Sequence, residues 1–371
     1  MGWYPQNDPR MGHLRHLVLL YGTDWTPEKL KYYVAHLDPE GRPDDWLFDS
    51  FLFIVLSAPG GGGSFIADVN RGTTMSGEGD FYAIPVPKPA DKEDYEALLD
   101  LYFREGGLLD NLQAIVAGLK AVLGAPEHPR NVVLSIPYPG INQTMWGRLE
   151  PGGRILNFGC VGQNLTRATE DRLAATCWWV DQALARWDPR RYPDLNLLGF
   201  YWVFETVYRS WEVDDHWLLK ELRRHLEKAD KRFLWIPFYS SYNVHLLDNY
   251  QDYYFDLAFQ QPNHMFYVKT PGIKGPALAA QARGAGFEME YYVELNEPTQ
   301  VAAERHLRFR HYLDGGVYFG YMHAACAWFH GSNGIMQMHS HPDPQERAFY
   351  EDIYRFVKGT YEPKLSRDEI P

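Results

Sequence analysis

The chain has 371 residues, of which 45% are hydrophobic and 23% charged, a balance that excludes a disordered protein. Its 36 Lys and Arg against 48 Asp and Glu give a net charge of −12, which argues against nucleic acid as a partner. Three separated cysteines without a CxxC pair indicate neither a zinc site nor a disulfide framework.

The hydropathy of the chain argues against membrane association. No apolar run approaches the ~18 residues of a membrane span. The first residues, MGWYPQNDPRMGHLRH, lack the apolar core of a signal peptide. We therefore expect a cytoplasmic protein with no membrane partner, or a secreted one if a leader has been trimmed from this sequence.

Aromatic residues are in excess. The 12 Trp, 25 Tyr and 20 Phe make up 15% of the chain. Tyr and Trp combine a flat apolar face with a polar edge, which suits either a large core or stacking on sugar rings. Both explanations stay open at the level of composition.

Short apolar runs alternate with amphipathic stretches along the whole chain. The apolar runs predict eight strands, at 16–22, 46–56, 131–139, 195–205, 232–239, 255–262, 286–295 and 317–323. Helical periodicity and capping residues predict a helix from Pro27 onward and further helices at 94–123, 169–187, 214–229, 299–313 and 344–361. Gly315 and Gly316 are expected to end the helix at 299–313.

Eight strands interleaved with helices predict a parallel sheet, and eight is the number that closes an α/β (β/α)8 TIM barrel. A doubly wound open sheet is the alternative, but it often carries a Gly-rich phosphate turn. The GGGG run at 60–63 fits no such motif and is interpreted as a loop. With elaborated loops at 57–91 and 140–168 and no internal repeat, residues 1–371 are expected to form one domain.

Function in such a barrel lies at the carboxyl ends of the strands, the mouth of the barrel. This rule selects polar and aromatic residues near the predicted strand ends as candidates for substrate binding. They are Asp24, Asp49, Tyr138, Tyr201, Tyr239, Gln261, Asn263, Glu288 and Tyr321.

Glu205 ends the otherwise apolar run LLGFYWVFE. Its charge is expected to face a polar space at the mouth rather than the core. By strand alternation it shares a face with Tyr201 and Gly199, and a small residue suits the crowded barrel interior. The alternative is a solvated or ion-paired charge at the strand end.

Glu288 and Glu290 are two residues apart and therefore share the inward face of the seventh predicted strand. Two acids on one inward face are costly unless they are paired or used in catalysis. An Arg or Lys partner from a neighbouring strand is the structural alternative, above all for the deeper Glu288. Glu294 shares the face if the strand ends later.

Acids at the ends of strands four and seven resemble the pair of the large retaining (β/α)8 clan of glycoside hydrolases. The resemblance implies that Glu205 is the acid/base and Glu290 the nucleophile, with carboxyl groups ~5–5.5 Å apart. The clan usually has Asn before the strand-four Glu, and here Phe204 stands there. A separation of ~6.5–9.5 Å would instead imply inversion.

A second resemblance covers most of the chain. The fragments HLVLLYG, DDWLFDSFLF, FLWIPFY, FDLAFQQPN and GFEMEY, in this order and spacing, resemble the bacterial domain-of-unknown-function 4855 family. That family is similar to barrel glycosidases and carries no firm substrate, so the resemblance implies the fold more than the activity.

The leading hypothesis is a glycoside hydrolase whose partner is a carbohydrate substrate, without a metal or cofactor. A glycan-binding barrel without catalysis is one alternative. Another is a barrel hydrolase acting on a non-sugar substrate through a metal at the HSH segment, His339 and His341 with Asp343. A solvated loop is the simpler interpretation of that segment. Sugar, linkage, exo or endo action and oligomeric state stay open.

Overall fold

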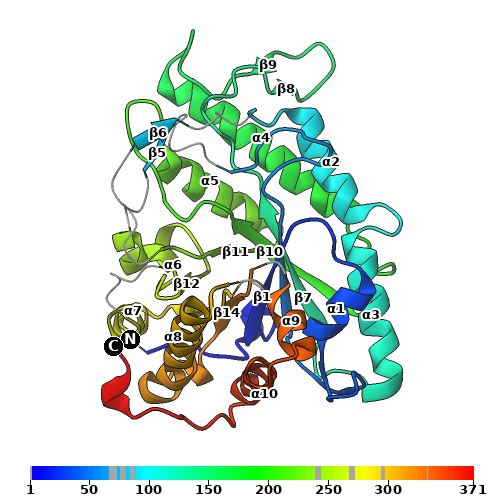
Figure 1. Cartoon of the computed structure of the whole chain (residues 1–371). Coiled ribbons are helices and arrows are strands. Elements are labelled where there is room, and N and C mark those ends of the chain that lie inside the picture. Colours follow the sequence, from blue (N-terminus) through cyan, green and yellow to red (C-terminus); the bar gives the residue numbers. More distant parts are fainter. Residues whose placement is uncertain are drawn as a thin grey trace.

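A computed structural model describes residues 2–66, 73–75, 81–83, 88–238, 244–266, 272–293, 297–331 and 333–371. Eight parallel strands close into a barrel in the order β1-β14-β13-β12-β11-β10-β7-β4 (Figure 1). The strands are β1 (His16–Tyr21), β4 (Ser50–Ile54), β7 (Arg130–Ile136), β10 (Leu195–Trp202), β11 (Arg232–Trp235), β12 (Leu257–Gln260), β13 (Gly286–Glu290) and β14 (Cys326–Phe329). The predicted TIM barrel is confirmed, and closure excludes the open sheet.

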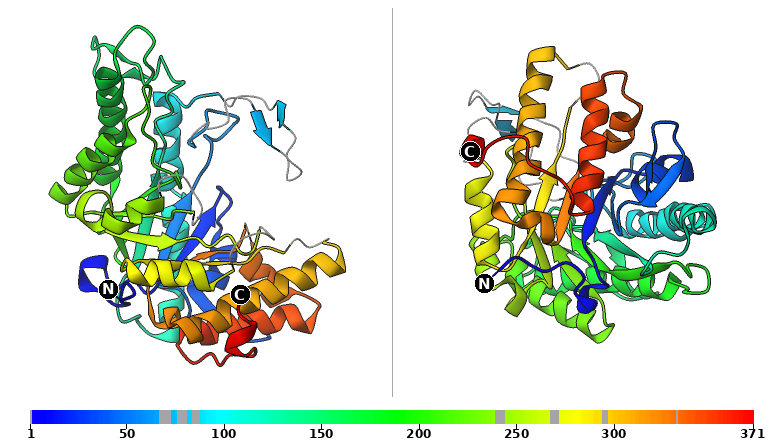
Figure 2. Two further views of the ribbon diagram at one scale, coloured as in Figure 1. Left: turned by 90° about the vertical axis from the view of Figure 1, so that its left-hand side faces the viewer. Right: turned by 90° about the horizontal axis from the view of Figure 1, so that it is seen from below.

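Helices connect successive strands and cover the outside of the barrel, with α8 and α10 side by side (Figure 2). They are α1 (Pro27–Val34), α2 (Lys92–Phe103), α3 (Leu108–Leu123), α4 (Leu165–Arg186), α5 (Asp215–Lys228), α6 (Tyr250–Tyr253), α7 (Lys274–Ala282), α8 (Thr299–Phe319), α9 (Gly334–Ser340) and α10 (Pro344–Val357). The described ranges also contain the 3-10 helices η1 (Pro9–Met11), η2 (Val244–Asn249), η3 (Tyr321–His323) and η4 (Arg367–Glu369).

Among the described residues, three two-stranded hairpins stand outside the barrel. Their strands are β2 (Ala35–Leu37) with β3 (Pro43–Trp46), β5 (Thr73–Met75) with β6 (Phe81–Ala83), and β8 (Gly147–Arg148) with β9 (Ile155–Leu156). The second and third hairpins fall within the long loops expected at 57–91 and 140–168.

The predicted eighth strand at 317–323 is wrong. Helix α8 continues through Gly315 and Gly316 to Phe319, η3 follows, and β14 is the strand that closes the barrel. The two glycines serve packing rather than helix termination, because a Cβ at Gly316 would lie 2.3 Å from the ring of Phe356 in α10. The two glycines, which in the sequence resemble the end of a helix, are therefore explained by the close approach of α8 and α10.

The predicted helix at 94–123 is two helices, α2 and α3, separated by a turn in which Gly106 has φ of 67°. By length and composition alone, Lys92–Leu123 is one segment apolar enough to cross a membrane. The turn interrupts that segment, and Leu109, Leu112 and Val116 of α3 are buried against the rest of the fold. Helix α3 thus packs one face against the rest of the fold, while Ala117, Gly118 and Val122 on its other face are exposed.

Much of the aromatic excess belongs to the core. Trp146, Trp179, Trp202 and Trp235 are fully buried. The core also encloses an ion pair, in which Arg172 of α4 donates to Asp215 of α5 at 2.6 Å. Such a pair ties two helices together, since removing one partner would leave an uncompensated buried charge.

Candidate active site

Glu205 lies three residues beyond the end of β10, in the loop at the mouth of the barrel, and is half-buried. Burial raises the pKa of its carboxyl group from 4.5 to about 7, although a hydrogen bond from the side chain of Gln261 opposes the rise. A carboxyl with this pKa exchanges its proton near neutral pH, as a general acid must.

Glu288 and Glu290 lie on β13 and are almost completely buried. Burial raises the pKa of both carboxyl groups well above the usual value, and the charge of Glu205 adds to the rise for each. The alternation of the strand turns Phe287 outward, where its ring stacks on Tyr321 at 4.3 Å. Strands β10 and β13 therefore bring three interacting carboxyl groups together.

Hydrogen bonds distinguish the two glutamates of β13. Glu290 accepts the backbone N–H of Asn263 at 3.1 Å, the hydroxyl of Tyr312 in α8 and the backbone N–H of Met265. Oε2 of Glu288 has no hydrogen-bond partner among the residues that the structure describes. Because hydrogen bonds to the charged form stabilise it, these contacts favour the ionised form of Glu290 over that of Glu288, although burial raises the pKa of both.

The donors to Glu290 are themselves held in place. The oxygen of Tyr312 accepts the backbone N–H of His264 at 3.1 Å, which directs its hydroxyl hydrogen toward the carboxylate. Asn263 has φ of 57°, a left-handed conformation that Asn adopts more readily than most residues. Asn263 thus serves Glu290 through its backbone amide, not through the side chain that the sequence singled out.

Two tyrosines flank the carboxyl groups. Burial, together with the charges of Glu205 and Glu288, raises the pKa of Tyr21 and Tyr201 well above 10. Tyr201 was predicted at the mouth, whereas Tyr21 was missed. As the last residue of β1, Tyr21 satisfies the strand-end rule that selected the others.

Tyr21 also begins a set of half-buried rings, here called the aromatic wall: Tyr21, Phe266, Tyr292 and Phe329. Tyr21 contacts Phe329 edge-on with centroids 5.5 Å apart, and Phe329 contacts Phe266 at 5.6 Å. Phe329 is the register partner of Glu290 on β14, so the wall adjoins the carboxyl groups.

Two predicted site residues lie away from the mouth. Asp49 precedes β4 at the amino-terminal end of the barrel, where it accepts the backbone N–H groups of Arg15 and His16, each at 3.1 Å. The strand predicted at 46–56 begins too early, because Trp46 belongs to β3. Tyr321 lies in η3 outside the barrel and donates to the backbone carbonyl of Tyr312.

The remaining predicted residues have varied surroundings. Tyr138 is buried beyond β7 and donates to Asp215 at 3.0 Å, and its ring packs on Phe204 in the loop that carries Glu205. Asp24 is exposed and forms an ion pair with Lys29. Tyr239 and the alternative acid Glu294 lie outside the described residues.

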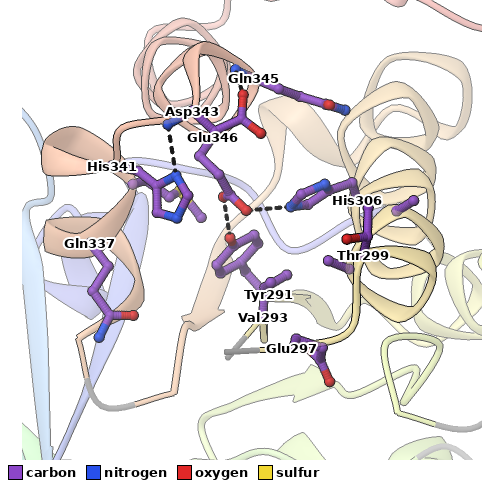
Figure 3. Close-up of a pocket in the computed structure, with 13 residues that line it drawn as sticks. Tyr291, Val293, Glu297, Thr299, His306, Gln337, His341, Asp343, Gln345 and Glu346 are labelled. Carbon is purple, nitrogen blue, oxygen red and sulfur yellow. Dashed lines mark hydrogen bonds and ion pairs between the residues drawn. The ribbon is translucent and has the colours of Figure 1, made fainter. Parts of the chain in front are cut away.

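His341 and Asp343 of the HSH segment line a cavity of about 280 Å³ between β13, α8, α9 and α10 (Figure 3). There Glu346 lies between Tyr291, which donates to it at 2.6 Å, and His306, whose Nε2 is 2.5 Å away. Nδ1 of His341 accepts the backbone N–H of Asp343. Within the described ranges, no group of three or more His, Cys, Asp or Glu is arranged to hold a metal ion.

A family model described as "Domain of unknown function (DUF4855)" matches residues 19–355. No curated protein matches the chain.

Similar solved structures include a mutant tryptophan synthase α-subunit from Pyrococcus furiosus, 12% identical over 96% of this chain and 99% of that one, with a TM-score of 0.37. The GH20 modules of a pneumococcal exo-β-D-N-acetylglucosaminidase are 9% identical over 95% and 84%, with a TM-score of 0.40. Xylanase B from Clostridium stercorarium is 9% identical over 88% of each chain, with a TM-score of 0.37. Scores this low carry no argument about the chemistry of this chain.

Proposed function

The chain belongs to the DUF4855 family, and from the carboxyl groups at the mouth of its barrel we propose that it is a glycoside hydrolase. The observation that carries the proposal is the contrast between Glu205 and Glu290. Burial raises the pKa of both carboxyl groups, that of Glu205 to about 7, but Glu205 has one side-chain donor among the described residues whereas Glu290 accepts three hydrogen bonds that favour its ionised form. Two interacting carboxyl groups whose environments separate their roles are what acid-assisted glycoside cleavage requires.

The proposed reaction is a retaining double displacement. Protonated Glu205 gives its proton to the glycosidic oxygen while the carboxylate of Glu290 attacks the anomeric carbon, forming a glycosyl-enzyme and releasing the aglycone alcohol. Water then attacks the anomeric carbon, Glu205 takes up its proton, and the bond to Glu290 breaks. Asn263 and Tyr312 hold Glu290 in the orientation for attack.

Other groups at the mouth suit the binding of a sugar. Protonated Glu288 can donate its hydrogen to a hydroxyl of the substrate, which would provide the partner that Oε2 lacks within the described chain. The aromatic wall offers half-buried ring faces to the C–H groups of a pyranose. We therefore propose a carbohydrate as the substrate class.

The test is a panel of chromogenic aryl glycosides with the wild-type chain and three variants. Glu205→Gln and Glu290→Gln are each expected to lower turnover by ~10²–10⁴-fold, because each removes a reacting group. Glu40→Gln, in an exposed turn where Glu40 pairs with Arg42, is the matched control and is expected to retain full activity. Full activity in either of the first two variants would overturn the assignment.

The stereochemistry of the first-formed product, followed by NMR, tests the retaining step. We expect the product to retain the anomeric configuration. An inverted product would indicate that a carboxylate activates water for the attack instead of attacking the sugar itself. If calorimetry detects sugar binding but no turnover occurs, the barrel is a glycan-binding module. Phe204, which occupies the position of the clan's Asn and packs on Tyr138 and Tyr208, is the feature that favours this second outcome.

A further inference from the structure

A second cavity, of about 190 Å³, lies at the amino-terminal end of the barrel, opposite the mouth. It is lined by residues at the starts of three barrel strands: Arg15 before β1, Asp49 before β4 and Arg130 at the start of β7. Trp46 of β3 and Lys358 after α10 complete one side. None of these residues takes part in the proposed hydrolysis.

Arg130 is the unusual member of this lining. Its side chain is only 7% exposed, yet its guanidinium forms no hydrogen bond or ion pair with any residue in the described part of the chain. The guanidinium lies over the ring of Trp46, with its carbon 4.6 Å from the centroid. Burial lowers its pKa to about 10, so it remains charged at neutral pH. The charges of Asp49 and Asp45 oppose this fall, but neither carboxylate pairs with the guanidinium directly, and a buried charge without a direct partner is costly.

Three residues that line this cavity each carry an unpaired donor. Nε of Arg130, Nε of Arg15 and Nε1 of Trp46 are all buried and have no hydrogen-bond partner within the described ranges. No acceptor that lines the cavity is buried and unpaired in this way. A set of orphaned N–H groups with no orphaned acceptor calls for a ligand that supplies acceptors.

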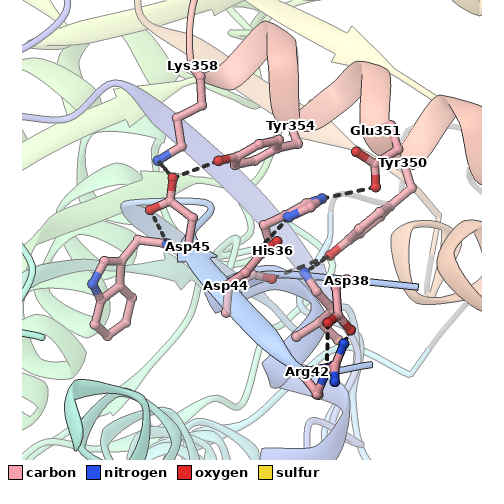
Figure 4. Close-up of polar contacts among 12 residues, drawn as sticks. His36, Asp38, Arg42, Asp44, Asp45, Tyr350, Glu351, Tyr354 and Lys358 are labelled. Atoms are coloured by element: carbon pink, nitrogen blue, oxygen red, sulfur yellow. Dashed lines mark hydrogen bonds and ion pairs between the residues drawn. The ribbon is translucent and has the colours of Figure 1, made fainter. Parts of the chain in front are cut away.

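The carboxylates of Asp45 and Asp49 do not accept these unpaired N–H groups, because their oxygens accept hydrogen bonds from other residues. Asp45 accepts from Lys358 and from Tyr354, each at 2.8 Å (Figure 4). Asp49 accepts the hydroxyl of Ser50 at 2.6 Å in addition to its two backbone donors. Neither carboxylate forms an ion pair with Arg15 or Arg130 within the described chain.

We propose that this cavity binds a small oxyanion of the phosphate class, held by Arg130 and Arg15 with Trp46 as a third donor. The planar guanidinium matches two phosphate oxygens at once. The cavity volume lies below the roughly 300 Å³ at which pockets for drug-sized ligands begin, which suits a small anion. The stacked rings of His13 and His128, 3.7 Å apart, also belong to its lining.

The test is titration calorimetry of the full chain with inorganic phosphate, with chloride at matched ionic strength as the reference and malonate as the carboxylate comparison. We expect saturable binding of phosphate and a phosphate-dependent rise of Tm. In Arg130→Leu, Kd is expected to weaken by ~10-fold or more and the rise of Tm to disappear. Arg190→Leu is the matched control, since the Arg190 side chain is 91% exposed and pairs with Asp188.

Trp46→Phe keeps a ring under Arg130 while removing one donor, and is expected to weaken phosphate binding several-fold. It keeps the test decisive if Arg130→Leu does not fold. Three results would each overturn the proposal. They are the absence of a phosphate-specific heat or Tm shift, equal phosphate affinity of wild type and Arg130→Leu, and binding of malonate but not of phosphate. Glycosidase activity does not enter this test, so the two proposals fail independently.

Discussion

Among single residues, Glu288 and Glu290 illustrate how environment assigns different roles to identical side chains on one face of β13. Strand alternation predicts the shared face, and the structure has both side chains buried together. The partner that separates them, Tyr312, comes from the middle of a helix more than twenty residues away. A contact of that kind arises only from tertiary packing, and no spacing in the sequence signals it.

Glu288→Gln and Glu290→Gln form a matched pair of variants. Since protonated Glu288 is neutral and can donate a hydrogen bond, Gln is a close replacement, and kcat is expected to fall by less than about 10-fold. Glu290→Gln removes the carboxylate that attacks and is expected to lower turnover by ~10²–10⁴-fold. Steady-state kinetics on one aryl glycoside compares them. Equal losses in both variants would contradict the different protonation of the pair.

The pH dependence of activity follows from Glu205. Its pKa of about 7 means that the acid form is lost as pH rises through 7, so kcat/KM is expected to fall on the alkaline side of that value. Gln261→Leu removes a donor that favours the ionised form, which raises the pKa and moves the alkaline limb to higher pH. A pH–rate profile of both proteins checks the shift, and a limb that moves to lower pH would contradict the assigned contact.

At the level of the secondary-structure elements, the two ends of the barrel strands form two different proposed sites. The amino-terminal ends of β1, β4 and β7 surround the second cavity, while the loops and residues at the ends of β1, β10 and β13 carry the carboxyl groups and their tyrosines. The β10–β11 pair depends on close approach of the two backbones. A Cβ at Gly199 would lie 1.9 Å from the carbonyl oxygen of Arg232, next to a register shift in β10.

Gly199→Ala is therefore expected to destabilise the fold by about 3 kcal/mol, because backbone rather than a flexible side chain would have to move. Denaturant unfolding measures the change. Gly118→Ala is the matched control, because Gly118 is exposed in α3 and a Cβ there would have no atom within 4 Å. Ala at this position is expected to stabilise the helix by up to ~1 kcal/mol. A Gly199→Ala protein as stable as wild type would show that the strands separate without cost.

At the scale of the whole molecule, alternating apolar runs predicted seven of the eight barrel strands within a few residues. The eighth was missed because β14 has only four residues and follows an apolar helix end that itself resembles a strand. The fold of the barrel was thus predictable from periodicity. Periodicity could not predict the left-handed backbone at Asn263 or the unpaired donors around Arg130, since both depend on how distant segments pack.

We propose that residues 1–371 unfold as one unit. β1 pairs with both β4 and β14, so the barrel closes only when its last strand joins its first, and no part of the chain that lacks either strand contains a complete barrel. Denaturant transitions followed by near-ultraviolet circular dichroism of the buried tryptophans and by far-ultraviolet circular dichroism are expected to coincide. Two separate transitions would indicate two domains.

The positive φ of Asn263 has a consequence for how the sequence can vary. Its donor to Glu290 is a backbone amide, which every residue except proline possesses, so substitution does not remove the chemical group. Selection at this position therefore acts on the conformation that aims the amide. Residues that readily adopt the left-handed region, Gly and Asp besides Asn, are the tolerated replacements, and β-branched residues are the ones that a library screened for activity would lose.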